Sequence, residues 1–297
     1  MATALASVPR AERPYSAKEF KTDLKPIWCP GCGDFGVLAA LTKALAEVNV
    51  APENVAVLTG IGCAGRLPGY VSSYGFNALH GRVLPLATGL KITRPDLLVF
   101  AAGGDGDGLA IGAGHFPHAA RRNADFTYLM FDNQVYGLTK GQFSPTTPLG
   151  DVTTTSRFGS IEVPMNPTAL AMVYGASFVA RAFSGNVPHH AEMILEAFRH
   201  PGFAFIQSIP PCVTFRGNEQ FKTIREKARW LSPDEHDPAD RDAAWEIASQ
   251  SDIYDMSFGV IWKEERPTYE ERLGFLREKA SKRGPGELDS VLDRFRP

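Results

Sequence analysis

Short apolar runs alternate with segments of helical period along the first two thirds of the chain. Five of the apolar runs are predicted to be buried strands, because each is short, rich in residues that favour strands and bounded by turn residues. These runs are residues 55–59, 97–102, 126–131, 176–180 and 203–209. Continuous apolar runs of this kind are typical of parallel strands that are covered on both faces.

Segments with apolar residues near a 3.6-residue period are predicted to be helices between these strands. They are residues 35–48, a helix that ends near Lys91, and residues 109–120, 169–174 and 188–199. Asp34 is predicted to be the N-cap of the first helix, and Pro117 is predicted to interrupt or kink the third. The alternation of strands and helices predicts an α/β fold with a doubly wound parallel sheet.

The two ends of the chain differ from this alternating region. Residues 1–24 are polar and have no sustained period, so we expect an arm that lies on another surface or is mobile. Residues 216–297 contain long polar stretches and few strand candidates, and we expect an extension that packs on partners. Residues 25–215 would form the catalytic-type domain. Within it, the unpatterned segment 143–165 is expected to be a functional loop, such as a lid.

Composition and charge exclude several classes of protein. The chain has 297 residues, of which 44% are hydrophobic and 22% charged, as expected of a soluble globular protein. A formal net charge of −2 and an isoelectric point near 6.4 indicate no basic face for nucleic acid or membrane. No run reaches the roughly eighteen apolar residues of a spanning helix. We therefore expect a cytoplasmic protein without nucleic-acid or membrane partners.

Glycine-rich polar sequence follows one predicted strand, and an asparagine follows the next. Residues 103–108 read GGDGDG directly after the strand at 97–102, and Asn133 comes after the strand at 126–131. Asp105 and Asn133 are 28 positions apart, which places each just past the carboxyl end of its strand. Open α/β sheets bind ligands at that edge. The two side chains are therefore expected to converge.

The residue types at this predicted crevice suit a magnesium-bound diphosphate. Mg²⁺ takes about six oxygen ligands and usually needs only one or two carboxylates beside the phosphates. Asp105, the amide of Asn133 and the carbonyl of Val135 would provide three of them. The glycines let the backbone approach a diphosphate closely, and the N–H groups at the following helix start favour negative charge. The alternative is a solvated Asp-Gly turn followed by an unrelated Asp-Asn turn.

Four cysteines occur as one close pair and two single positions. Cys29 and Cys32 form the pair, Cys63 lies 31 positions further on, and Cys212 lies another 149 beyond it. Cys63 and Cys212 each follow a predicted strand end, so the fold can bring all four together. A structural zinc site usually combines two close couples, so this pattern favours a [4Fe–4S] cluster. The alternative is that Cys63 and Cys212 are buried apolar residues.

These motifs resemble those of one family closely. The segments GGDGDGLAIG, HAARRN and DNQVYGLTKGQ carry the resemblance around the diphosphate site, and WCPGCG, GIGC and PCVT carry it around the cysteines. In residues 28–214 the chain is similar to the β subunits of the 2-oxoacid:ferredoxin oxidoreductases. The resemblance implies the thiamine diphosphate-binding type of doubly wound sheet, followed by a C-terminal extension.

The resemblance also implies roles for the matching residues. The magnesium ligands would be Asp105, Asn133 and the Val135 carbonyl, and Lys140 would face the carboxylate of the 2-oxoacid. The [4Fe–4S] ligands would be Cys29, Cys32, Cys63 and Cys212. Contacts to thiamine diphosphate are implied for Ile61, Gly62, Cys63, Ala64, His80, Gly106, Asp107, Gly137 and Leu138.

The implied reaction is the oxidative decarboxylation of a 2-oxoacid to an acyl-CoA and CO₂, in either direction. 2-Oxoglutarate is the favoured substrate, pyruvate is the second candidate, and CoA is the co-substrate. Electrons would pass singly through the cluster to ferredoxin. The implied partner is a separate α subunit that supplies a catalytic glutamate, in a dimer of αβ heterodimers. Two alternatives remain: a non-oxidative thiamine-dependent decarboxylase or carboligase, and a zinc-stabilised interaction module without catalysis.

Overall fold

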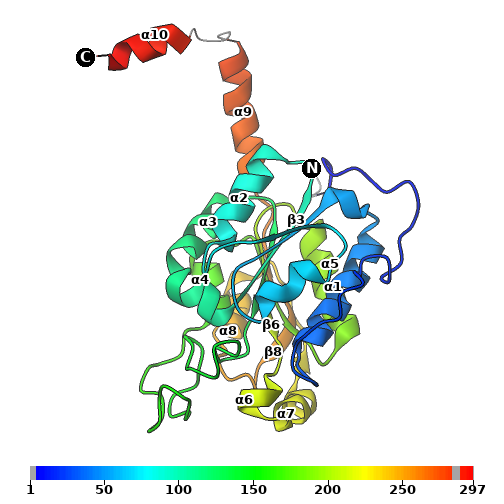
Figure 1. The fold of residues 1–297 in the computed structure, drawn as a ribbon, viewed down its shortest axis with the longest axis vertical. Coiled ribbons are helices and arrows are strands. Elements are labelled where there is room, and N and C mark those ends of the chain that lie inside the picture. The colour runs from blue at the N-terminus through cyan, green and yellow to red at the C-terminus, as the bar shows by residue number, and fades with distance from the viewer. Residues whose placement is uncertain (1–4, 283–287, 297) are drawn as a thin grey trace.

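One mixed sheet forms the centre of the molecule. The computed structural model describes residues 5–282 and 288–296, and eight strands within them form a sheet in the order β2-β1-β3-β4-β6-β5-β8-β7 (Figure 1). The first six strands are parallel, whereas β8 is antiparallel to β5 and parallel to β7. Their bounds are Val55–Thr59 (β1), Tyr74–Asn77 (β2), Leu98–Gly104 (β3), Thr127–Phe131 (β4), Phe178–Phe183 (β5), Ala204–Ile209 (β6), Arg229–Trp230 (β7) and Ser257–Lys263 (β8). The predicted fold class is confirmed.

Helices cover both faces of this sheet (Figure 1). Val57 and Phe100 face the cluster that contains α1 and α5, whereas their neighbours Leu58 and Ala101 face the cluster that contains α2, α3, α4 and α8. Successive strand residues point to opposite faces, so an all-apolar strand needs a helix layer on each side. The helix bounds are Asp34–Val48 (α1), Val83–Thr93 (α2), Phe116–Arg122 (α3), Pro167–Val173 (α4), Val187–Arg199 (α5) and Arg241–Ala248 (α8).

The segment after β3 differs from the single helix expected for residues 109–120. It consists of a π-helical turn at Asp107–Ile111, a 3-10 turn at Ala113–His115 and then α3. Pro117 lies in the first turn of α3, where its missing N–H leaves no helical hydrogen bond unmade. Pro117 therefore interrupts the expected helix, because a new helix begins at this point.

The start of α1 corrects another expectation. Gly33 is the N-cap residue, and Asp34 is the first residue of the helix with its side chain fully buried. No side chain caps this helix. Asp34 is therefore a buried carboxyl group beside Cys32, and its burial raises its pKa to about 7.

Both ends of the chain pack on the sheet more than their sequences indicate. Leu5, Val8 and Phe20 are buried in the same cluster as α1, so the described part of the N-terminal arm lies on its own chain. At the other end, β8 is largely buried and pairs with β5, in a segment for which few strands were predicted. The first half of the C-terminal extension therefore completes the sheet. Between β6 and β8 the chain forms α6 (Val213–Arg216) and α7 (Glu219–Lys227), followed by β7 and α8.

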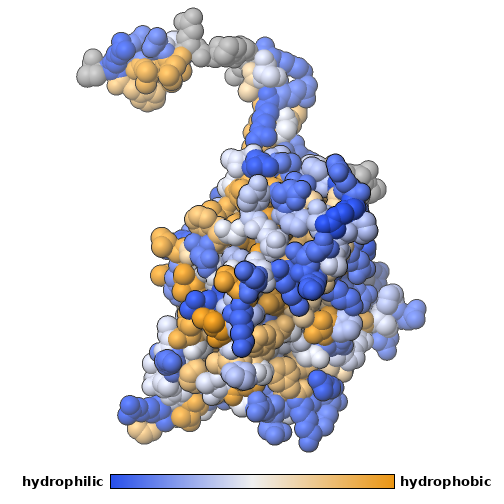
Figure 2. Space-filling view, turned by 45° about the vertical axis from the view of Figure 1, so that its right-hand side comes forward, coloured by the Kyte–Doolittle hydropathy of each residue, from blue (hydrophilic) through white to orange (hydrophobic). Residues whose placement is uncertain are grey.

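Beyond β8 the chain leaves the globular body. Helix α9 (Tyr269–Ser281) projects away from it and α10 (Leu288–Leu292) lies further out (Figure 1). Leu288, Val291 and Leu292 of α10 are exposed, and Figure 2 shows hydrophobic side chains on this helix. Among residues 5–282 and 288–296, no helix combines the length and apolar character that a membrane crossing requires.

His190 in α5 makes the stability of this fold sensitive to acid. It is fully buried, both ring nitrogens lack a hydrogen-bond partner among the described residues, and burial lowers its pKa to about 3. Below the unfolded pKa of about 6.5 the unfolded chain binds a proton that the folded chain excludes, so stability falls as pH falls. Through this residue the free energy of unfolding of the wild type should fall by on the order of 1 kcal/mol between pH 7.5 and 5.5.

The measurement is urea unfolding at both pH values. His190→Leu should show a pH-dependent loss that is smaller by that amount, whereas His118→Leu, which changes an exposed histidine of α3, should behave as the wild type. Equal pH dependence in wild type and His190→Leu would contradict the prediction.

Candidate active site

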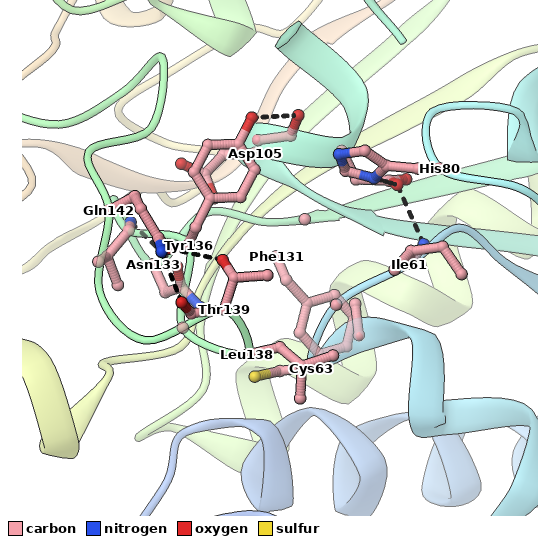
Figure 3. Close-up of a pocket in the computed structure, with 17 residues that line it drawn as sticks. Ile61, Cys63, His80, Asp105, Phe131, Asn133, Tyr136, Leu138, Thr139 and Gln142 are labelled. Atoms are coloured by element: carbon pink, nitrogen blue, oxygen red, sulfur yellow. Dashed lines mark hydrogen bonds and ion pairs between the residues drawn. The ribbon is translucent and has the colours of Figure 1, made fainter. Parts of the chain in front are cut away.

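The carboxyl ends of β1, β3 and β4 open into one cavity of about 440 Å³ (Figure 3). The loops that follow these strands form its walls, together with His80 from the turn before α2. All twelve residues that the sequence predicts for the diphosphate and its metal line this cavity: Ile61, Gly62, Cys63, Ala64, His80, Asp105, Gly106, Asp107, Asn133, Val135, Gly137 and Leu138. Parallel strands that end at one edge bring these separate segments together. The expected convergence of Asp105 and Asn133 on one cavity is confirmed.

Asp107 connects three segments of this wall. Its Oδ1 accepts hydrogen bonds from the backbone N–H of Ile61 at 3.0 Å and of Gly81 at 2.8 Å, and it lies 2.6 Å from Nδ1 of His80 (Figure 3). A Cβ atom on Gly60 would collide with the same carboxylate, so glycine is required there. Asp107 therefore fixes the loop after β1 and the position of the His80 ring.

Asp105 lies in a buried pair of carboxyl groups. Its Oδ2 accepts hydrogen bonds from the hydroxyls of Ser144 and Thr146, and Oγ1 of Thr146 is 2.7 Å from Oδ1 of Asp132. Burial, and after it the neighbouring Asp132 carboxylate, raises the pKa of Asp105 to about 7. The Thr146 hydroxyl has one proton for two carboxyl groups. The pair is therefore well suited to bind a cation, whose positive charge would favour the ionised forms.

The donors around Asp105 are hard oxygen ligands. Among residues 5–282 and 288–296, no three His, Cys, Asp or Glu side chains are grouped closely enough to hold a metal ion. A cation here would depend on one carboxylate of the cavity wall, the amide of Asn133, the carbonyl of Val135 and oxygens of a ligand. Mg²⁺ prefers this arrangement, because it usually takes one or two carboxylates and completes its shell with phosphates and water. The residues present fit a magnesium diphosphate.

Tyr136 is a wall residue that the sequence analysis did not single out. Its hydroxyl donates to the carbonyl of Gly106 at 3.0 Å, and a Cβ atom on Gly106 would collide with its ring (Figure 3). Glycine at 106 therefore allows the loops after β3 and β4 to touch. The sequence contains no local signal for this contact, because Tyr136 and Gly106 belong to different loops that become neighbours only in the folded sheet.

All four cysteines line a second cavity of about 170 Å³. Cys29 is exposed, Cys32 and Cys63 are partly buried and Cys212 is buried, and all four are free thiols. Burial raises the pKa of Cys63 to about 12 and also raises the pKa of Cys212. These thiols would ionise only beside positive charge, such as bound iron. All four cysteines thus line one cavity, although within the described residues no three of them are close enough to bind a single metal ion.

The two cavities share a wall. Cys63, Asn133, Gly137 and Leu138 line both of them. A Cβ atom on Gly137 would lie 3.4 Å from Sγ of Cys63 and 3.8 Å from Sγ of Cys212, so the absence of a side chain leaves room between the thiols. Lys140 lines the cysteine cavity and is absent from the lining of the larger one.

Comparison with known proteins gives the same class of protein as the site. Residues 60–208 match the C-terminal TPP binding domain of thiamine pyrophosphate enzymes, and residues 212–278 match the C-terminal region of the pyruvate ferredoxin oxidoreductase beta subunit. The sheet, the cavity at its carboxyl edge and the first match define a thiamine diphosphate-binding subunit.

Individual relatives identify the family. The chain is 40% identical over 269 residues to subunit beta of 2-oxoacid:ferredoxin oxidoreductase 2 from Aeropyrum pernix, covering 86% of each chain. It is 36% identical to 2-oxoglutarate synthase subunit KorB from Methanocaldococcus jannaschii, covering 88% of this chain and 97% of that one. The chain belongs to the β subunits of the 2-oxoacid:ferredoxin oxidoreductases, as the motifs predicted.

A solved structure extends this comparison to the whole fold. The 2-oxoglutarate:ferredoxin oxidoreductase from Magnetococcus marinus, with 2-oxoglutarate, coenzyme A and succinyl-CoA bound, superposes with a TM-score of 0.90 at 38% identity. The match covers 98% of this chain and 100% of that chain. The two chains therefore share the same overall fold.

Asp107→Ala should lower the free energy of unfolding by about 2–4 kcal/mol, because the buried N–H of Gly81 and the partly buried N–H of Ile61 lose their acceptor. Asp107→Asn keeps an Oδ1 acceptor and should lose less. Denaturant unfolding of the purified chain measures both values. If Asp107→Ala were as stable as Asp107→Asn, the carboxylate would not be connecting the loops.

Proposed function

We propose that this chain carries the thiamine diphosphate and one [4Fe–4S] cluster of an enzyme that oxidatively decarboxylates a 2-oxoacid to an acyl-CoA and CO₂. The observation that carries the proposal is the wall shared by the two cavities. A cofactor in the larger cavity and a cluster among the four cysteines would be separated by the residues that line both. Electrons released in the larger cavity would then have a short path to an outside carrier, ferredoxin.

Residues of the larger cavity would hold magnesium and the diphosphate. Asp105, Asn133 and the Val135 carbonyl supply the oxygen ligands, and the glycine-rich turns after β1 and β3 allow backbone N–H groups to approach the phosphates. His80, whose ring is fixed by Asp107, lines the same wall. When bound, thiamine diphosphate supplies the electron sink that protein side chains lack.

The cysteine cavity would hold the cluster. Cys29 and Cys32 from one loop, Cys63 from a second and Cys212 from a third offer four thiol ligands, a pattern that suits a cluster with several irons more than a single zinc ion. Burial of Cys63 and Cys212 keeps water from their sulfurs. Such shielding tunes the potential of a cluster.

Lys140 and Arg66 are the cationic residues that line the cysteine cavity. Lys140 follows the shared-wall residues Gly137 and Leu138, so its ammonium group is available to the carboxylate of a 2-oxoacid that lies between the cavities. 2-Oxoglutarate is the favoured substrate, since the Magnetococcus marinus enzyme was solved with it and the relative from Methanocaldococcus jannaschii carries its name.

An α subunit would complete the active site. No glutamate lines either cavity in the described part of the chain, although thiamine activation needs a carboxylate beside the aminopyrimidine. Large apolar side chains are exposed on and near the loops of the larger cavity, which indicates a protein partner over its mouth. They are Ile61, Leu79, Ile111 and Leu138. The proposed assembly is a dimer of αβ heterodimers in the cytoplasm.

Two substitutions in the assembled complex test the proposal. Asp105→Ala should lose most bound Mg²⁺ and thiamine diphosphate while it keeps its iron, because the cation loses its carboxylate ligand. Cys212→Ala should lose most iron and all ferredoxin reduction while it keeps part of its thiamine diphosphate. Metal analysis, sulfide analysis and thiamine fluorescence measure the contents.

Two other results would each indicate a different function for this chain. Full thiamine and catalysis without iron in the wild type would indicate a non-oxidative decarboxylase or carboligase. Bound zinc without thiamine would indicate an interaction module.

A further inference from the structure

Solvent exposure changes sharply along the long segment 143–165. Ser144, Thr146 and Thr147 are each at most 3% exposed, whereas Phe158 is fully exposed and Ile161 is 91% exposed. Buried hydroxyls in irregular chain need hydrogen-bond partners, since an unpaired buried polar group is costly. Their partners show what this end of the loop does.

The buried residues of 144–147 contact the two turns that carry the proposed magnesium ligands. Ser144 and Thr146 donate to Oδ2 of Asp105, after β3. Thr147 donates through Oγ1 to the carbonyl of Gln134 at 2.8 Å, after β4, between Asn133 and Val135. We call residues 144–147 the latch. It links the turn that contains Asp105 with the turn that contains the other two ligands.

The latch is braced internally. Oγ1 of Thr147 accepts a hydrogen bond from the N–H of Ser144 at 2.7 Å, and the N–H of Thr147 donates to the carbonyl of Ser144 at 3.0 Å. Ser144 and Thr147 thus satisfy hydrogen-bonding groups of the turn itself. The Thr146 hydroxyl is not needed for that turn, because its contacts are to the carboxyl groups of Asp105 and Asp132.

Asp132 connects the latch to a buried positive charge. Its Oδ2 accepts from Nε2 of Gln207 at 2.7 Å, and Oε1 of Gln207 accepts from Nε of Arg181 at 2.8 Å. Arg181 is fully buried and also donates to the carbonyl of Ser257 in β8 at 2.9 Å. The chain of contacts runs across the neighbouring strands β4, β6, β5 and β8. A buried guanidinium at its end compensates the charge of Asp132 and fixes its orientation.

We propose that Thr146 is a positioning residue for the magnesium site. Held between Asp132 and Asp105, it sets the rotation of the Asp105 carboxyl group. The latch hydroxyls occupy Oδ2, so we expect the cation to bind Oδ1. Mg²⁺ demands near-ideal octahedral geometry, so a carboxylate with a fixed rotation binds it better than a free one. Residues that orient metal ligands typically contribute 10- to 100-fold to metal affinity.

The inference rests on the proposed function, and a metal titration tests it. The αβ complex is stripped with EDTA and saturated with thiamine diphosphate, and bound Mg²⁺ is measured by equilibrium dialysis with metal analysis. Thr146→Val, which has nearly the same shape without the hydroxyl, should raise the Mg²⁺ dissociation constant about 10- to 100-fold. Thr146→Ser should restore it to within about threefold of the wild type. Thr154→Val, on the exposed part of the same segment, is the matched control and should bind as the wild type.

A second variant and a stability measurement separate positioning from folding. Ser144→Ala removes the other hydroxyl that donates to the same Asp105 oxygen, and it should weaken Mg²⁺ binding several-fold. The melting temperature of the metal-free complex should fall less for Thr146→Ser than for Thr146→Val, because the hydroxyl is kept. If Thr146→Val and Ser144→Ala both bound Mg²⁺ within twofold of the wild type, the positioning role would be overturned while the proposed function stood. If the wild type bound neither Mg²⁺ nor thiamine diphosphate, the proposed function itself would fail.

Discussion

Two carboxyl groups, those of Asp105 and Asp132, are buried side by side where β3 and β4 end. Burying negative charge is unfavourable unless hydrogen bonds and positive charge compensate for it. On the protein side the compensation comes from Thr146 and from the chain of contacts through Gln207 to Arg181. On the cavity side no lysine or arginine of the described residues lines the wall, and a divalent cation bound with a diphosphate would compensate the carboxyl groups there.

The other features of the site follow from the need to bring a cofactor to this edge. Parallel strands of similar length end together, so the loops after β1, β3 and β4 face one space. Asp107 holds the first of these loops against the turn before α2, and Tyr136 holds the other two together. Gly137 keeps the shared wall thin next to Cys63 and Cys212.

The strands that are buried on both faces could be predicted from the sequence, because their apolar runs have no other stable environment. The edge strand β2 and strand β8 could not, since both depend on a neighbour: β2 is exposed along its length, and β8 lies between polar stretches and gains its place from pairing with β5. The break before α3 was only partly predictable. Pro117 indicated an interruption, but the π-helical turn is set by the contacts of Asp107.

Asp105, Asn133 and the four cysteines could be predicted from residue chemistry and spacing, whereas the other cofactor contacts were implied by the family resemblance. The supporting contacts were not predicted. Thr146, Gln207 and Arg181 are unremarkable in sequence, and their partners are distant positions that only the folded sheet brings near. The position of Lys140 relative to a bound substrate is still a prediction.

We propose that this chain holds the cofactor and the cluster but becomes a catalyst only when a second subunit covers the cavity. The most direct measurement is ferredoxin reduction with 2-oxoacid and CoA, by this chain alone and after addition of its α subunit. We expect negligible ferredoxin reduction by the isolated chain, although iron and sulfide are present in it, and a large increase with the α subunit. Substantial reduction by the isolated chain would contradict this proposal and would require a catalytic glutamate within these 297 residues.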